Sequence, residues 1–109
     1  MGWLLRDGDV LAAVETARGP KAKAKGLLGR AGIEGALYLP HTRAVHTLGM
    51  RFRIDVAYLD RQQRVVKMET VRAWRLPLPV LRARSVVEAE AGAFERWKLA
   101  VGDQLEVRP

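Results

Sequence analysis

Polar and charged side chains interrupt a strand-forming run between Val45 and Asp60, and they have more chemistry to offer than any other part of the chain. His46, Arg51 and Asp55 all lie within this run. An ionised carboxylate among apolar side chains costs on the order of several kcal/mol unless it finds partners. We therefore expect Asp55 to pair with an arginine, to accept backbone N–H bonds, or to face a wet cleft.

Five residues are candidates for a cleft that holds an anionic ligand. A guanidinium offers a fork of donors to carboxylate or phosphate, a tryptophan supplies a flat wall, and a nearby carboxylate orients the guanidinium. The candidates are His46, Arg51, Asp55, Trp74 and Glu88. Two competing interpretations stay open: Asp55 forms an architectural ion pair or caps backbone groups, and Trp74 plugs one end of a barrel.

Motifs for catalysis or metal binding are missing. His41 and His46 are the only histidines, and a spacing of five on a strand would point them to opposite faces. No nucleophile elbow surrounds Ser85. Arginines near Asp55 and Glu88 would lower the carboxylate pKa, which suits acid catalysis poorly. We expect no catalytic residue, metal or cofactor, with a hydrolase or transferase of unknown substrate as a remaining alternative.

Composition sets the broad class of the protein. A chain of 109 residues fits a single domain, 1–109, and the lack of cysteine excludes disulfides and thiolate chemistry. No apolar run approaches the ~20 residues that span a bilayer. We therefore expect a monomeric cytoplasmic protein with no membrane partner.

The net charge of +7 is concentrated in the middle of the chain. Residues 18–84 carry fifteen Lys or Arg against four acidic residues. Such a field favours anionic partners through steering and counterion release. The first hypothesis is a non-catalytic binding or accessory protein whose cleft takes an anionic small molecule or an acidic polymer segment. The alternative is nucleic-acid binding through Arg18, Lys21 and Lys25, which would line one face of a helix.

Hydrophobic periodicity and turn signals predict about seven strands and two short helices. Strands are expected at 3–6, 10–16, 34–39, 45–59 with a break near Gly49, 64–71, 85–90 and 104–107, and helices at 17–31 and 91–99. Ala24, Leu27, Leu28 and Ala31 would form the apolar face of the first helix. Without βαβ alternation, this order favours a mostly antiparallel α+β domain, built as a partly closed barrel or coiled sheet.

The motifs together resemble the family known as domain of unknown function 192. The matching pieces are Arg18 with Gly26–Arg30, Val45–Thr47 through Met50–Arg51 to Ile54–Val56, Trp74–Arg75, Val87–Glu88 to Ala91–Gly92, and Val101–Asp103. Two positions depart from the family pattern. Many relatives carry aromatic-Met-Lys-Asn-Thr where this chain has His46–Arg51, and glycine where it has Gln63. The resemblance implies a compact β-rich domain with short helices, and it implies no activity.

Overall fold

The computed structural model describes residues 2–30 and 32–109. Met1 and Ala31 lie outside the described residues, so the predicted place of Ala31 on the apolar helix face is not addressed. Neither helix in the described part of the chain is long enough to cross a membrane, since they contain seven and four residues.

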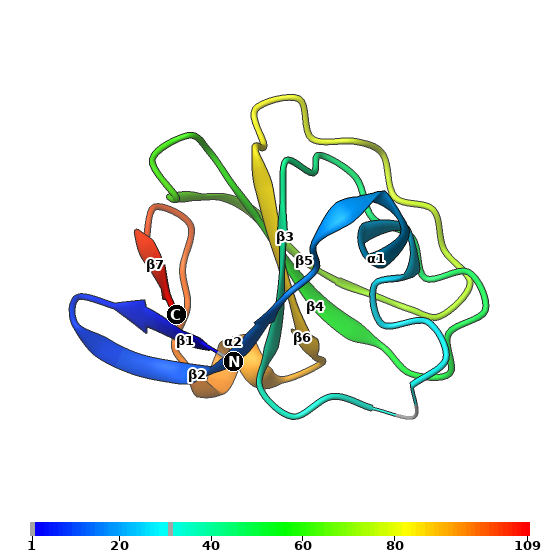
Figure 1. The fold of residues 1–109 in the computed structure, drawn as a ribbon, viewed down its shortest axis with the longest axis horizontal. Helices are drawn as coiled ribbons and strands as arrows, with labels where there is room; N and C mark the ends of the chain where they lie inside the picture. Colours follow the sequence, from blue (N-terminus) through cyan, green and yellow to red (C-terminus); the bar gives the residue numbers. More distant parts are fainter. Residues whose placement is uncertain (1, 31) are drawn as a thin grey trace.

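Seven strands form one mixed sheet in the order β5-β4-β6-β3-β2-β1-β7 (Figure 1). All neighbouring pairs are antiparallel except β2 and β3. The strands are β1 (Gly2–Arg6), β2 (Asp9–Thr16), β3 (Ala36–Pro40), β4 (Ile54–Leu59), β5 (Val65–Val71), β6 (Ser85–Glu90) and β7 (Leu105–Arg108). The predicted β-rich α+β class is confirmed.

The two edges of the sheet approach each other without forming a continuous ladder. Arg64 and Gln104 form an isolated bridge. The Val65 N–H donates to the Asp103 carbonyl at 2.8 Å, and the Leu105 N–H donates to the Gln63 carbonyl at 2.9 Å. The sheet is therefore a partly closed barrel, as the sequence predicts.

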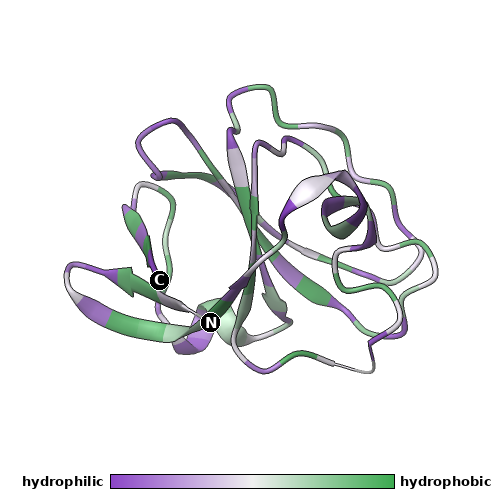
Figure 2. Ribbon diagram, in the orientation of Figure 1, coloured by the Kyte–Doolittle hydropathy of each residue, from purple (hydrophilic) through white to green (hydrophobic). Residues whose placement is uncertain are grey.

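Side chains on the two faces of the sheet belong to two separate hydrophobic cores. The inner core fills the barrel and includes Leu4, Val14, Val65, Val87 and Phe94. The outer core lies beneath α1 (Gly19–Lys25) and the long loops, and it includes Leu27, Leu37, Val56, Tyr58 and Val86. Strand β4 contributes side chains to both cores, and all six of its residues are buried. Figure 2 shows mainly hydrophobic residues along the central strands and hydrophilic ones on α1.

Two segments differ from the sequence prediction. Helix α1 ends at Lys25 because Gly26 takes a positive φ of +50°, which leaves the helical conformation and which glycine adopts readily. Residues 45–53 form a loop where a strand is predicted. Gly49 has φ +79°, and a Cβ there would lie 2.8 Å from the Leu28 Cδ1 atom. This segment therefore wraps closely around the residues that follow α1 and does not extend the sheet.

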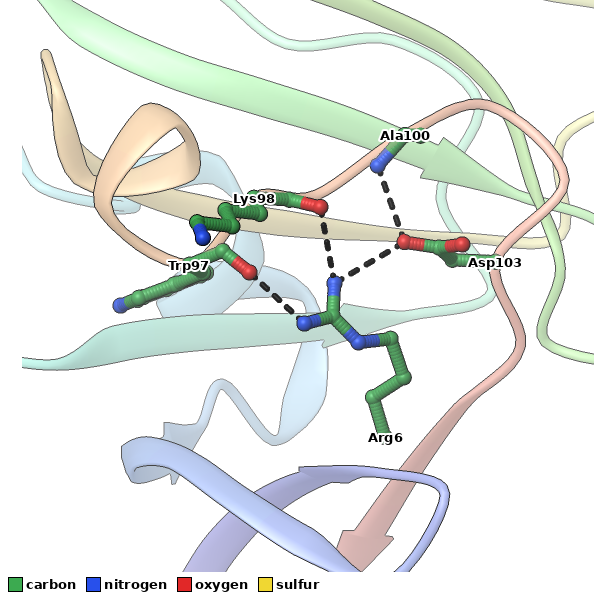
Figure 3. Close-up of polar contacts among 5 residues, drawn as sticks. All are labelled: Arg6, Trp97, Lys98, Ala100 and Asp103. Carbon is green, nitrogen blue, oxygen red and sulfur yellow. Dashed lines mark hydrogen bonds and ion pairs between the residues drawn. The ribbon is translucent and has the colours of Figure 1, made fainter.

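Helix α2 (Ala93–Arg96) closes one end of the barrel and is held at its far side by Arg6. The Arg6 guanidinium donates to the Trp97 carbonyl at 2.8 Å, to the Lys98 carbonyl at 3.0 Å and to the Asp103 carboxylate at 3.0 Å (Figure 3). Asp103 also accepts the Ala100 N–H at 2.9 Å. This cluster ties α2 and the turn after it to the end of β1.

Candidate functional site

Asp55 satisfies its buried carboxylate with hydrogen bonds to the N-terminus of α2. Its Oδ2 atom accepts the backbone N–H groups of Gly92 at 3.0 Å and Phe94 at 3.1 Å, while Oδ1 accepts the Thr70 hydroxyl at 2.7 Å. Among the three explanations that the sequence leaves open, the structure selects backbone N–H acceptance, and no ion pair joins Asp55 to Arg51 among the described residues. Asp55 therefore anchors the plug of the barrel.

Glu88 lies in the outer core with no partner for one carboxylate oxygen. The residue is only 3% exposed, and its Oε1 atom has no hydrogen-bond partner among the described residues. Burial raises the pKa of Glu88 to about 7. A Cβ on Gly26 would lie 3.3 Å from this oxygen, so the glycine lets the end of α1 close over the carboxyl group.

Asp55 and Glu88 point to opposite faces of the sheet. In the register of β4 and β6, Val56 is paired with Glu88 and Asp55 with Ala89. Successive residues of a strand alternate between faces, so Asp55 faces the barrel end and Glu88 the outer core. The five candidate residues of the sequence analysis do not surround one cleft.

His46 and Trp74 lie on either side of a fixed junction between two loops. The His46 ring holds the end of α1, with Nε2 2.8 Å from the Ala24 carbonyl and Nδ1 accepting the Leu48 N–H at 3.2 Å. The backbone N–H of Trp74 donates to the backbone carbonyl of Thr47, and Thr47 is a fully buried residue. Trp74 has φ +63°, strained for a non-glycine residue by about 1 kcal/mol or more, and its side chain is 65% exposed. An exposed ring does not plug a barrel end.

The remaining candidates are cations on the surface. Arg51 is exposed, and no ion pair with it exists among the described residues. Lys21 and Lys25 lie on the exposed part of α1, and Arg18 directly precedes the helix. Of these residues, only Arg18 also lines a large hollow.

The end of the barrel opposite α2 opens into a hollow of about 650 Å³, which we call the barrel mouth. It lies where β3 ends and β6 begins, whereas Asp55 and α2 lie at the other ends of these strands. Its lining comes from β1, β2, the segment between β2 and α1, β3, the β4–β5 turn, β7 and the residue after β7. The lining residues are Gly2, Val14, Glu15, Thr16, Arg18, Tyr38, Pro40, Gln63, Val107 and Pro109.

Three linked side chains lie at this end of the barrel. The Gln63 Nε2 atom donates to the Tyr38 hydroxyl at 3.1 Å, and its Oε1 atom accepts the hydroxyl of the buried Ser85 at 3.0 Å. Gln63 has φ +64°, a conformation that favours glycine. Glycine would adopt this φ without strain, yet the chain has Gln63 at this position. The side-chain amide of Gln63 lines the barrel mouth.

The charges at the rim of the barrel mouth leave Arg18 available to a ligand. Glu15 is paired with Arg30 at 2.8 Å, and this hydrogen bond lowers the pKa of Glu15 below its usual value. Arg18 has neither an ion pair nor a side-chain cap bond within the described residues. Tyr38 is absent from the site residues that the sequence suggests. Ser85 enters there only as a nucleophile without an elbow motif, and Gln63 only as a departure from the family pattern.

Sequence comparison identifies relatives whose activity is not assigned. The family model of DUF192, described as an uncharacterized ACR, matches residues 4–107. A UPF0127 protein of Pyrococcus furiosus is 38% identical over 63 residues, which make up 58% of this chain and 54% of that protein. This chain thus matches about half the length of that relative.

Structural comparison identifies two crystal structures with the same fold. A protein of unknown function from Novosphingobium aromaticivorans has a TM-score of 0.81 at 21% identity, over 96% of this chain and 83% of that chain. A protein from Sinorhizobium meliloti, provisionally named a transcription regulator, also has a TM-score of 0.81, at 20% identity over 97% and 91% of the two chains. At these identities, the likeness establishes the fold alone.

Proposed function

The chain belongs to the uncharacterised DUF192 family, as its motifs indicate, and we propose that it is a non-catalytic binding protein that takes an anionic small molecule into the barrel mouth. The observation that carries the proposal is the hollow of about 650 Å³, with an arginine at its rim that has no ion pair among the described residues and a polar amide network beside it. Ligand sites typically occupy roughly 300–1,000 Å³ and often lie in the mouths of barrels.

Each part of the barrel mouth has a role in this proposal. The Arg18 guanidinium binds the carboxylate or phosphate group of the ligand by a charge-assisted pair of hydrogen bonds. Tyr38 and Gln63 offer donors and acceptors to the polar part of the ligand. The apolar side chains of Val14 and Val107 contact its carbon skeleton.

A binding role fits the chemistry of the lining better than catalysis does. Glu15 is the only carboxylate side chain in the lining, and its lowered pKa makes it a poor proton donor near neutral pH. Glu88 has a pKa in the range that acid–base catalysis uses, but its carboxyl group is sealed beneath α1. The group with suitable acidity is therefore kept away from the hollow.

The first experiment measures binding by calorimetry to citrate, pyrophosphate, glucose 6-phosphate and adenosine monophosphate. We expect saturable binding of at least one probe and a loss of about tenfold in affinity in Arg18→Gln, because one charge-assisted contact is removed. Lys21→Gln is the matched control, since Lys21 is exposed on α1 and does not line the hollow. Its affinity should equal that of the parent protein.

Two results would count against the proposal. No saturable binding of any probe, or equal affinity in the parent and Arg18→Gln, would exclude the barrel mouth as an anion site. Nucleic-acid binding, the alternative function, predicts that Lys21→Gln and Lys25→Gln weaken binding as much as Arg18→Gln does. It also predicts that the logarithm of affinity falls with the logarithm of salt concentration by about 0.9 per neutralised phosphate.

A further inference from the structure

Large exposed apolar side chains occur in a segment of the chain that does not line the barrel mouth. It is the loop of residues 72–84, between β5 and β6. The exposed fractions are 65% for Trp74, 72% for Leu76, 81% for Leu78 and 80% for Leu81. Isolated exposed leucines are common, but four such side chains within eight residues indicate a contact surface.

The fold fixes this loop at several points. The Thr47 N–H donates to the Arg75 carbonyl at 2.9 Å, and the Arg75 N–H donates to the Thr47 hydroxyl at 2.8 Å. Farther along, the Val80 N–H donates to the Arg43 carbonyl at 2.9 Å. The apolar side chains therefore project from an anchored backbone.

Most of the charges around these side chains are positive, although Glu69 of β5 lines a hollow together with Arg75 and Leu76. The loop contains Arg72, Arg75, Arg82 and Arg84, all exposed, and the sequence has no Asp or Glu from residue 70 to residue 87. The neighbouring loop of residues 41–53 adds Arg43, Arg51 and Arg53, also exposed and without any acidic residue. None of these seven arginines has an ion pair within the part of the chain that the structure describes.

We propose that the 72–84 loop adsorbs to an anionic lipid surface, with its apolar side chains inserted among the acyl chains and its arginines at the headgroups. Tryptophan and leucine inserted below a basic collar are the features by which peripheral proteins bind anionic membranes. Arginine also extends its apolar stem along such an interface while its charge stays in water. The complementarity of charge is what favours lipid over a neutral apolar partner.

Adsorption of this kind needs no membrane-spanning segment. The expectation of no membrane partner rests on the length of the apolar runs, and that length bears on spanning alone. The inserted groups here come from a short loop whose prolines, Pro77 and Pro79, keep the chain extended and out of a helix.

The experiment is co-sedimentation with vesicles of phosphatidylcholine alone and of phosphatidylcholine with 30% phosphatidylglycerol. We expect the parent to sediment with the anionic vesicles only, and less strongly as salt increases. The double variant Leu76→Ser/Leu78→Ser should partition at least tenfold more weakly, because two inserted side chains are lost. Val101→Ser, which changes an exposed valine outside the loop, should bind as the parent does.

Four outcomes would overturn the lipid proposal. The first is no binding to anionic vesicles, and the second is equal binding by the parent and the double variant. The third is binding only to poly-glutamate, which mimics an acidic protein. The fourth is a protein that does not bind vesicles but forms a dimer in solution, which the two substitutions dissociate. The proposal is independent of the barrel mouth. Arg18→Gln should sediment with anionic vesicles as the parent does, whatever its affinity for small anions.

Discussion

Asp55→Ala should lower the free energy of unfolding by about 4 kcal/mol and the melting temperature by roughly 20 °C. The change removes the acceptor of the Gly92 and Phe94 N–H groups at the start of α2. A hydrogen bond to a charged group contributes about 1.5–3 kcal/mol, and the buried Phe94 N–H finds no replacement. Urea denaturation followed by circular dichroism measures the loss.

Two further variants distinguish this role of Asp55 from a general cost of substitution. Asp55→Asn keeps one acceptor oxygen but turns an NH₂ group toward a donor, so we expect a loss of about 2 kcal/mol in a protein that still folds. Asp60→Ala removes a carboxylate that accepts two N–H bonds in a partly exposed turn, and it should cost about 1 kcal/mol. A loss in Asp55→Ala no larger than in Asp60→Ala would contradict the anchoring of α2.

Glu88→Gln should make the protein more stable at high pH. The folded-state pKa of Glu88, about 7, lies above its ordinary value of 4.5, so the folded state binds the proton more tightly than the unfolded state. This contribution is fully present below pH 4.5 and is lost as the pH rises through 7. Between pH 5 and pH 8.5, the stability of the variant relative to the parent should increase by roughly 2–3 kcal/mol.

The test compares urea denaturation of the parent and variant at several pH values. Glu90→Gln changes an exposed carboxylate two residues along the same strand and serves as the matched control, with the same pH dependence as the parent. A stability difference between parent and Glu88→Gln that does not change with pH would mean that the Glu88 carboxyl group titrates as an ordinary exposed one does.

Local patterns predict most of the fold because each strand buries at least one face. Alternating or continuous apolar residues mark β2, β4 and β6, and Asp7 and Gly8 mark the first hairpin. The segment from Val45 to Arg53 has the composition of a strand, but Gly49 and its contact with Leu28 turn it around the end of α1. That contact joins two distant segments, so local periodicity carries no sign of it.

The candidate site is harder to predict because it depends on register and on closure of the barrel. Asp55 and Glu88 are both polar residues within buried strands, and only the pairing of Val56 with Glu88 reveals that they face opposite ways. The barrel mouth joins Arg18, Tyr38 and Gln63, which no single motif contains. One local signal does exist in the loop between β4 and β5. Gln63 has a positive φ there, a conformation that favours glycine, and the loop contains no glycine.

The side-chain amide of Gln63 tests the central claim most directly. Its two N–H signals can be followed by nitrogen-15 NMR during titration with the anions named above, and they are assigned by their loss in Gln63→Gly. A bound anion should shift the signals of Gln63 saturably and leave those of Gln62 and Gln104, which lie outside the barrel mouth, unchanged. Equal or absent shifts at the three glutamines would contradict the assignment of the barrel mouth as the binding site.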